Sequence, residues 1–349
     1  MPEPTTDEQM QKVRTFERGF IGVLVILTGT ELGLFAALER AGAPGLTAAE
    51  LAARLGLHAP YVRFWCETAY ALELLDADAA GRFQLQPNLG EVLVDESNPR
   101  NLAASLRFSG LEVYKDLVRF PEFFRSGATF TYQDHDASLS HAVADITKNF
   151  YVVFVGGVTK RVRGMRERLG AGARFLEIGC GAGALPRELA KRYPASRFTG
   201  VDSDRHAIQR GREGIAAEGL GDRVTLLVAN GAAFGEAASF DYVSMVVTLH
   251  EVRADDKEAV LRNAHRVLRP GGVFLNLDFS YPARREELRQ PEFSYGVMDQ
   301  YMEMVWGNRH LSIPEVRALV ERCGFRDLEQ HPFNQGAFTL TVGVKPGET

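Results

Sequence analysis

The fold of this chain is decided by one stretch, Arg174-Phe175-Leu176-Glu177-Ile178-Gly179-Cys180-Gly181-Ala182-Gly183. An apolar strand runs into a glycine-rich turn, and the residues that follow, through Arg192, predict a helix. The backbone amides of such a turn would line a ligand site at the N-terminus of the helix. The pattern G-x-G-x-G differs from the G-x-G-x-x-G of dinucleotide sites, and Glu177 would repel a pyrophosphate. A carboxylate there suits a ligand that carries an ammonium group or hydroxyls.

Predicted strands and helices alternate from Arg174 onward. The predicted strands span residues 174–179, 197–202, 223–229, 240–247, 273–279, 326–332 and 337–345. This alternation predicts a doubly wound α/β fold with a mostly parallel sheet and ligands at the carboxyl ends of the strands. The last two strands leave no room for a crossover helix, so they must pair antiparallel.

Two further strand ends carry polar residues. Asp202 ends the second strand, 25 residues beyond Glu177, where an acid can accept both ribose hydroxyls of an adenosine. Asp204 is the alternative for this role, or it caps the next helix. Asn230 follows the third strand and can donate and accept hydrogen bonds, which suits an adenine. A glycine-rich turn without any ligand is the simpler alternative.

Together these residues resemble motif I and the downstream acid of the class I S-adenosylmethionine-dependent methyltransferases. The resemblance implies a Rossmann-like domain with a seven-stranded sheet. It also implies a set of residues that bind S-adenosylmethionine. This set is Glu177, Gly179, Gly181, Gly183, Asp202, Ser203, Asn230 and Gly231.

The end of the fourth strand narrows the resemblance. Leu249-His250-Glu251, followed by Asp255-Asp256-Lys257, is similar to the Leu-His-Asp stretch of small-molecule O-methyltransferases of plant phenylpropanoid, acetylserotonin and bacterial polyketide pathways. By this resemblance His250 is the general base that takes a proton from a substrate hydroxyl, and Asp278 orients it. An ordinary imidazole, with a pKa of about 6.5, is mostly neutral in the cytosol and can accept a proton. The alternative is a structural histidine.

One position departs from that family. His310 stands where the second flanking carboxylate of the base is expected, and a histidine cannot stabilise an imidazolium in the same way. We expect His310 to hydrogen-bond a substrate or a backbone group, with no metal bound. Two imidazoles, His250 and His310, could instead ligate a metal ion. Some C-methyltransferases of 2-oxo acids on this scaffold depend on iron, so metal-assisted C-methylation stays an alternative.

The acceptor pocket is predicted from apolar residues. Residues 295–306 place Met298, Met302 and Val305 on one helical face, which is usually core, but the equivalent helix of the O-methyltransferases lines the acceptor pocket. The aromatic-rich residues 100–165 can contribute rings to a pocket at a domain junction. The expected pocket residues are Phe150, Met298, Met302 and Trp306.

The N-terminal region has the order of a winged helix. Thr47 and Glu50 form a capping box, and a turn at Gly56, a longer helix and a small hairpin at residues 81–85 follow. After Arg63 the longer helix continues with apolar and acidic residues, which do not suit binding in a DNA groove. We therefore expect a dimerisation module, with residues 20–27 in a buried helix at a subunit contact. Residues 1–12 are expected to be loosely ordered.

Composition excludes several classes of protein. The chain has 349 residues, of which 45% are hydrophobic, and this composition is typical of a globular protein. Its net charge of −5 does not favour binding to nucleic acid. The three cysteines lie far apart in the sequence and support neither a disulfide framework nor a cysteine metal site. The apolar residues 20–27 are too few to span a membrane, and they lack the flanking residues of a signal peptide. We expect a cytoplasmic protein that does not bind membranes.

We therefore expect a homodimeric methyltransferase that methylates a hydroxyl of a small, aromatic metabolite. Its predicted domains are a winged-helix dimerisation domain over residues 1–100, a helical connector over 101–165 and the S-adenosylmethionine-binding domain over 166–349. Metal-assisted C-methylation is the first alternative. A winged-helix regulator that senses the cofactor is the second.

Overall fold

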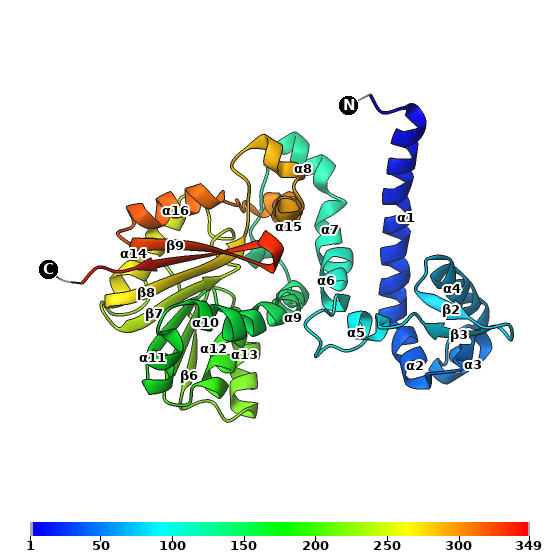
Figure 1. Ribbon diagram of the computed structural model, residues 1–349, viewed down its shortest axis with the longest axis horizontal. Helices are drawn as coiled ribbons and strands as arrows, with labels where there is room; N and C mark the ends of the chain where they lie inside the picture. Colours follow the sequence, from blue (N-terminus) through cyan, green and yellow to red (C-terminus); the bar gives the residue numbers. More distant parts are fainter. Residues whose placement is uncertain (1–2, 348–349) are drawn as a thin grey trace. The chain divides into compact units, whose positions relative to one another are not determined.

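The computed structural model describes residues 3–347, which form two compact units (Figure 1). Unit 1 extends to Lys115, and unit 2 begins at Asp116. The finer division that the sequence suggests within residues 101–165 stays a prediction.

Unit 1 is a mainly helical domain with a small sheet. Its helices are α1 (Thr6–Glu31), α2 (Leu34–Ala41), α3 (Ala48–Leu55), α4 (Ala59–Ala71), α5 (Leu89–Leu93), α6 (Ala103–Arg107) and the π-helix η1 (Phe108–Val113). Its strands β1 (Leu46–Thr47), β2 (Leu75–Ala77) and β3 (Arg82–Leu85) pair antiparallel in the order β1-β3-β2. The Thr47–Glu50 capping box starts α3, and Phe35 and Trp65 pack edge to face in the core. The predicted winged-helix order is confirmed.

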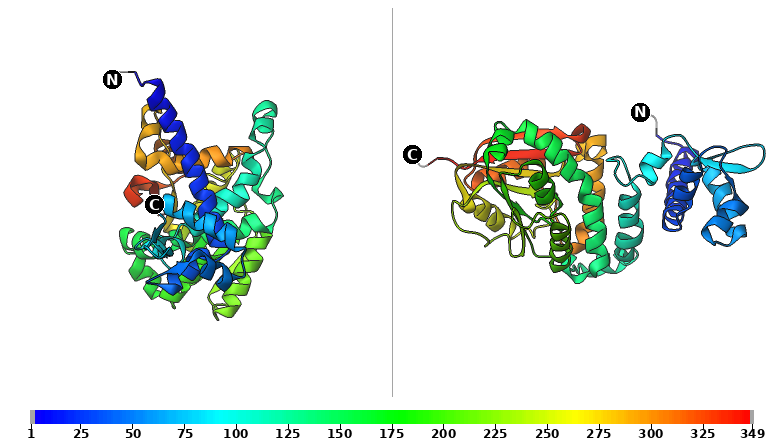
Figure 2. Two further views of the ribbon diagram at one scale, coloured as in Figure 1. Left: turned by 90° about the vertical axis from the view of Figure 1, so that its right-hand side faces the viewer. Right: turned by 90° about the horizontal axis from the view of Figure 1, so that it is seen from below.

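Helix α1 differs from its prediction. A capping box between Thr5 and Glu8 starts the helix at Thr6, so residues 6–12 are helical rather than loosely ordered. Leu27 is buried, but Phe20, Ile21 and Leu24 are exposed in the single chain, so their burial at a subunit contact stays a prediction. The helix extends beyond the rest of unit 1 (Figure 2), which leaves nothing within the unit to cover this part.

The described residues contain no single helix that is long and apolar enough to cross a membrane. Within residues 3–347, one pair of helices, α1 and α2, has the length and composition for this when taken together, with a bend of 69° between them.

Unit 2 begins with helices and continues as an alternation of strands and helices. The first helices are α7 (Tyr114–Leu117), which crosses the unit boundary, α8 (Phe120–Ser126), η2 (Tyr132–Asp134), α9 (Ala137–Val153), η3 (Phe154–Val158), α10 (Thr159–Arg161) and α11 (Met165–Ala171). The strands are β4 (Arg174–Ile178), β5 (Arg197–Asp202), β6 (Val224–Val228), β7 (Phe240–Val246), β8 (Leu268–Phe279), β9 (Arg326–Phe333) and β10 (Phe338–Val344). The helices among them are α12 (Ala184–Arg192), α13 (Arg205–Ala217), α14 (Lys257–Val267), η4 (Arg285–Arg289), η5 (Pro291–Phe293), α15 (Ser294–Glu303), η6 (Met304–Trp306), α16 (Ile313–Arg322) and η7 (Asn334–Gly336).

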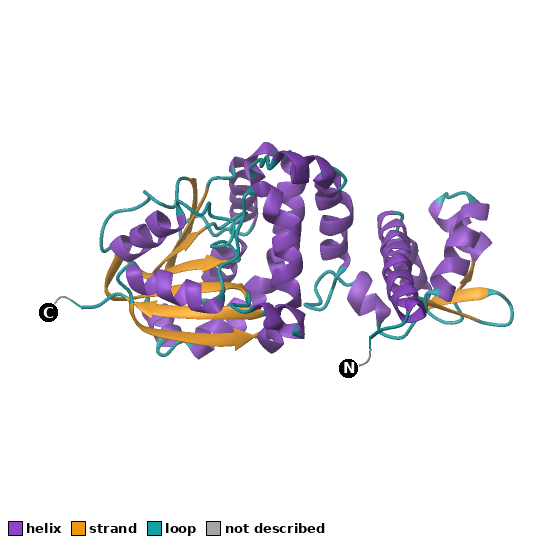
Figure 3. Ribbon diagram, turned by 90° about the horizontal axis from the view of Figure 1, so that it is seen from above, coloured by secondary structure: helices purple, strands orange, loops and turns teal. Residues whose placement is uncertain are grey.

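The seven strands of unit 2 form one sheet in the order β6-β5-β4-β7-β8-β10-β9. Strands β4 to β8 are parallel, and β10 runs antiparallel to both of its neighbours. The predicted α/β class and its antiparallel closing pair are confirmed. Helices cover both faces of the sheet (Figure 3). One core joins the sheet to α9, α11, α12 and α13, and a second joins it to α14 and α16.

The strand order reverses between β4 and β7. The chain moves from β4 outward to β5 and β6, and then returns to the other side of β4 as β7 and β8. A doubly wound sheet binds its ligands at the carboxyl ends of the strands at this point, because the following loops diverge there. The loops concerned are the glycine-rich turn after β4 and the turn of Thr248 to Glu251 after β7.

The opposite end of β7 is fixed by charge. Asp241 is buried, and its carboxylate accepts hydrogen bonds from Arg168, from Arg269 and from the backbone amide of Arg174 at the start of β4. These contacts tie α11, β4, β7 and β8 together at the end of the sheet away from the candidate site.

The three cysteines are free and buried.

Candidate functional site

The glycine-rich turn has a shape that requires glycine. Gly179 and Gly183 have φ values of +73° and +67°, and a Cβ atom would overlap Thr248 at the first position and Leu226 at the second. Gly181 also has a positive φ, of +50°, but no atom lies within 4 Å of its Cβ position. The turn is therefore packed against β6 and the β7 loop at its ends and open at its centre. That open side is where a ligand can approach the backbone.

Glu177 is a buried acid without a partner. Its side chain is fully buried, and neither carboxylate oxygen has a hydrogen-bond partner among the described residues. Ser244, its register neighbour on β7, also has a buried and unpartnered hydroxyl. Burial, together with the charge of Asp202, raises the pKa of Glu177 well above its usual value. A ligand that brings an ammonium group would satisfy this carboxyl group.

Asp202 holds the glycine-rich turn in shape. Its carboxylate accepts hydrogen bonds from the backbone amides of Gly181, at 2.7 Å, and Asp204, at 2.8 Å. Asp204 caps α13 by accepting from His206 and Ala207, so the structure favours the capping role for this residue. Ser203 lies exposed between the two acids.

The predicted adenine end lies after β6. Asn230 is exposed, and its amide oxygen accepts from the Ala232 backbone at 2.8 Å. Its amide nitrogen forms no hydrogen bond with the described residues. Gly231 lies close to Ile178 of β4, with its Cβ position 2.5 Å from that side chain. The structure thus brings Glu177, Asp202 and the turn of Asn230 to the same edge of the sheet.

His250 and Asp278 form a buried pair. His250 Nδ1 lies 2.6 Å from an Asp278 carboxylate oxygen, and the other oxygen accepts from the His250 backbone amide at 3.2 Å. The turn that carries His250 is fixed by Lys257, whose buried ammonium donates to the backbone oxygens of Leu249, His250 and Val252. Burial lowers the pKa of Lys257 to about 8. The pair leaves His250 Nε2 facing away from Asp278.

His310 lies beside the His250–Asp278 pair, and its hydrogen-bond partner is a carboxylate. The His250 and His310 rings stack with centroids 4.5 Å apart, and His310 Nε2 lies 2.8 Å from Asp299. The expectation that His310 hydrogen-bonds a substrate or a backbone group is therefore wrong for this nitrogen. A further carboxylate, that of Glu303, lies 3.6 Å from His250 Nε2 and accepts a hydrogen bond from the Asn308 amide. His250, Asp299 and His310 each offer a ligand atom, all within 4.8 Å of one another.

The acids around His250 change its protonation. Burial alone would lower the pKa of His250, but the charges of Asp278, Glu303 and Asp299 outweigh burial and raise it to about 10. The prediction of a mostly neutral imidazole is therefore wrong for the protein without ligands. The ordinary value applies to an isolated histidine, whereas the carboxylates of Asp278, Asp299, Glu303 and Glu251 lie near this one.

The other members of the cluster shift accordingly. Burial raises the pKa of Asp299 to about 6 and, with the charge of Asp299, that of Glu303 to about 7. Burial and the His250 charge lower the pKa of His310 to about 4, so the second imidazole is neutral near pH 7. A neutral imidazole beside carboxylates can exchange protons with them through hydrogen bonds, or it can ligate a metal ion together with them.

The predicted pocket residues divide into different environments. Phe150 packs edge-on against Phe279, whose ring borders both histidines. Met302 is half-buried and Met298 is 63% exposed. Trp306 is buried, and its indole donates to Asp116. Helix α15 ends at Glu303, before the predicted stripe is complete.

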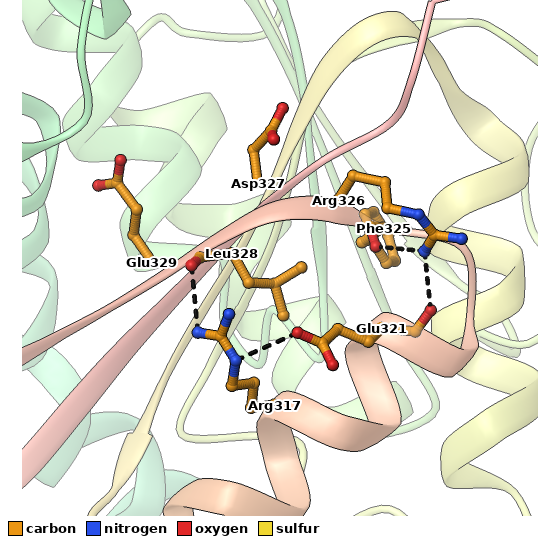
Figure 4. Close-up of a pocket in the computed structure, with 7 residues that line it drawn as sticks. All are labelled: Arg317, Glu321, Phe325, Arg326, Asp327, Leu328 and Glu329. Carbon is orange, nitrogen blue, oxygen red and sulfur yellow. Dashed lines mark hydrogen bonds and ion pairs between the residues drawn. The ribbon is translucent and has the colours of Figure 1, made fainter.

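A surface groove lies elsewhere, between α16 and β9 (Figure 4). Within it Arg317 pairs with Glu321, and Arg326 donates to the backbone oxygens of Glu321 and Phe325. None of its seven lining residues belongs to the constellations described above.

Comparison with known proteins agrees with this geometry. Residues 175–272 match the family described as "Methyltransferase domain". The ubiquinone/menaquinone biosynthesis C-methyltransferase UbiE of Hahella chejuensis is 32% identical over 236 residues, which cover 61% of this chain and 92% of that relative. The chain belongs to the class I S-adenosylmethionine-dependent methyltransferases. The methyl donor of this methyltransferase is S-adenosylmethionine.

Solved structures share the fold of the methyltransferase along nearly its whole length. An O-methyltransferase family protein from Burkholderia thailandensis has a TM-score of 0.79 at 18% identity, covering 99% of this chain and 100% of that one. Human N-acetylserotonin methyltransferase, solved in complex with S-adenosylmethionine, has a TM-score of 0.74 at 19% identity with the same coverage. At these identities the likeness shows the fold.

Sequence reasoning missed two site residues of the methyltransferase, Asp299 and Glu303. Both lie in the segment that was interpreted as an apolar pocket wall. Their spacing of four residues places them on one face of α15, turned toward His250. An acidic pair that interrupts an apolar helix is a signal that could have identified them.

The raised pKa of His250 can be tested with the variant Asp278→Asn. Removing the nearest carboxylate charge should lower the pKa of His250 from about 10 toward the ordinary value, because burial then meets less opposition. NMR titration of the imidazole resonances would measure the change. The exposed Asp255→Asn in the following loop is the matched control and should leave the pKa in place. An unshifted pKa in Asp278→Asn would contradict the assigned cause.

Proposed function

We propose that this methyltransferase transfers the methyl group to a hydroxyl of a small aromatic acceptor, with His250 and Asp278 handling the proton. The contact that supports this is the buried His250–Asp278 pair, beside the turn that would hold the cofactor. Bound S-adenosylmethionine supplies an electrophilic methyl group on a sulfonium. Glu177 would bind its ammonium group, Asp202 its ribose hydroxyls and Asn230 its adenine. The unpartnered carboxylate of Glu177 and the open face of Gly181 fit such a ligand.

Asp278 accepts the Nδ1 proton of His250 and so fixes the ring with Nε2 toward the acceptor. Phe279 and Phe150 give this region apolar ring faces, which suit an aromatic acceptor. Taking the proton from the acceptor hydroxyl makes its oxygen a better nucleophile, and base catalysis of this kind contributes about 10² to 10⁴ in rate.

The raised pKa of His250 favours a phenolic acceptor. An imidazole with a pKa of about 10 is a stronger base than an ordinary histidine, and a phenol has a pKa of about 10. The two groups are then matched, so one proton is shared between them at little cost. The reactive complex carries one proton fewer than the protonated histidine plus a neutral phenol. Its population therefore increases as pH rises toward 10.

The variant His250→Gln should lower kcat by about 10² to 10⁴, because glutamine cannot take a proton. S-Adenosylhomocysteine release with a panel of phenols would measure the rate, and NMR of the product would locate the methyl group on oxygen. His331→Gln, on β9 away from the cluster, is the control. In the wild type, kcat/KM should rise with pH from 7 toward 10. Full activity of His250→Gln, or a rate that falls over this range, would contradict the base role.

A second candidate function, metal-assisted C-methylation, is favoured by the histidine–carboxylate cluster. Two imidazoles and one carboxylate within 4.8 Å of one another are the donor set that non-haem iron prefers. Asp278 behind His250 would orient that ligand, as outer carboxylates do in metal sites. His250, His310 and Asp299 would hold the ion, with Glu303 beside them. A metal there would act as a Lewis acid toward an acceptor with two adjacent oxygens, such as a 2-oxo acid.

Metal analysis separates the two candidates. If the cluster is a metal site, wild-type protein loaded anaerobically with ferrous iron and desalted should retain it in stoichiometric amount by elemental analysis. His310→Ala and Asp299→Asn should lose the iron, while the control His331→Ala should keep it. Equal retention by the wild type and both site variants would contradict the metal site. A product methylated on carbon would support C-methylation.

We also propose that unit 1 mediates a homodimer through α1. Val13, Phe16, Phe20 and Leu24 lie on one face of this helix and are 64%, 66%, 51% and 42% exposed. A stripe of this kind on a helix that extends beyond its own unit supports burial against a second copy. The surface of α4 does not favour DNA instead, since its large exposed apolar residues are Tyr61, Phe64 and Tyr70, and its exposed Arg63 pairs with Glu67.

The double variant Phe16→Glu/Phe20→Glu should convert the dimer into a monomer, because it places charges in the apolar contact. Light scattering after size-exclusion chromatography would give the mass. Gln11→Glu/Thr15→Glu adds the same charge on the opposite side of α1 and should leave the dimer intact. A wild-type protein that is monomeric at micromolar concentration would contradict the proposal.

A further inference from the structure

The turn after β7 begins at a residue with a strained backbone. Residues 248–252 are called here the histidine turn, and Val247, directly before them, has a φ of +50°. This left-handed region is unfavourable for a side chain branched at Cβ, and such residues persist only where surrounding contacts hold them. The Val247 amide donates to the Leu277 backbone oxygen of β8 at 2.8 Å, which fixes the side toward the sheet. The histidine turn itself requires further contacts to keep its shape.

Lys257, the first residue of α14, supplies these contacts. It is 3% exposed, and its ammonium donates to the backbone oxygens of Leu249, His250 and Val252 at distances between 2.5 and 3.0 Å. Burying an ammonium is costly unless its donors are used, and these three hydrogen bonds use all of them. One buried side chain therefore holds three carbonyl groups of the histidine turn together.

The same contacts orient His250. Its backbone oxygen accepts from Lys257 and, at 3.2 Å, from the Arg309 amide, while its backbone amide and its ring Nδ1 both contact Asp278. The backbone and the ring are thus fixed together, and a movement of the histidine turn would displace Nε2. A displacement of a reacting group by about 1 Å can cost about 10² in rate.

We propose that Lys257 is a positioning residue for His250, whose ammonium holds the histidine turn in its strained conformation by donating to three backbone oxygens of that turn. The proposal rests on the proton-handling role proposed above for His250. Lys257 acts through the backbone of the turn and does not touch the reacting atoms. Without its ammonium, the turn can leave the conformation that begins at Val247, and Nε2 loses its place beside the acceptor.

The variant Lys257→Met removes the ammonium and keeps a long side chain. Its kcat should fall about 10- to 100-fold, measured as S-adenosylhomocysteine release with the phenol on which the wild type is fastest. The Kd for S-adenosylhomocysteine should change by less than about threefold by calorimetry. Lys345→Met is the matched control, because Lys345 also donates to backbone oxygens, those of Arg266 and Leu268, and its kcat should equal that of the wild type. Unchanged kcat in Lys257→Met, or an equal loss in the control, would overturn the proposal.

Chemical rescue separates positioning from a loss of stability. Lys257 lines a surface groove of about 280 Å³ together with Arg309 and Leu311, so propylammonium can reach the space that Lys257→Ala leaves. Propylammonium should restore part of the lost kcat, whereas tetramethylammonium, which has the charge but no N–H group, should not. Rescue by both cations or by neither would overturn the role of the three hydrogen bonds.

Amide hydrogen exchange tests the same contacts without an acceptor. The amides of Glu251 and Val252 donate to the Thr248 oxygen within the histidine turn, and they should exchange faster in Lys257→Met but not in Lys345→Met. Unchanged exchange in Lys257→Met would overturn the proposal. If the wild type methylated no phenol, the proposed function would fail, and the exchange would still show whether Lys257 holds the turn.

Discussion

The pairing of β4 with β7 is the constraint on which the candidate site depends. These strands are parallel neighbours, yet the chain leaves them toward opposite edges of the sheet. Their following loops must diverge, and the space between them becomes the binding crevice. Gly179 and Thr248 are in close contact across this space, with the Thr248 hydroxyl donating to the Gly179 oxygen. One strand pairing thus places the glycine-rich turn beside a histidine that lies about 70 residues further along the chain.

The chemistry of the site follows from the charge collected there. Asp278, Asp299 and Glu303 are acids around one buried imidazole, and the other imidazole, His310, is neutral near pH 7. Buried carboxylates require a cation. In the protein without ligands that cation is the proton on His250, helped by the ammonium of Lys257 behind the turn. A proton and a metal ion would compete for the same nitrogen, so the two proposed reactions would use the same group of side chains.

The sequence predicts the sheet and the cofactor side because these depend on local patterns. The order of strands, the glycine-rich turn, Asp202 and the His250–Asp278 pair each follow from residues at the end of a predicted strand. Asp299 and Glu303 could not be placed in this way, because they reach His250 from a helix whose packing is decided by tertiary contacts. The exposed face of α1 could not be assigned to a partner for a related reason. An apolar helix predicts burial, but the sequence does not specify whether its own chain or another one covers it.

The two ends of β7 have different roles. Asp241 at its start accepts from two arginines and an amide, and thereby joins a helix and two other strands, whereas the turn beyond its end carries His250. Five strand residues, Tyr242 to Val246, lie between Asp241 and the turn that carries His250. Evolution can therefore retune acceptor preference through the loops at one end while the contacts of Asp241 maintain the sheet at the other. This separation allows a single scaffold to acquire new substrates without having to be stabilised again each time.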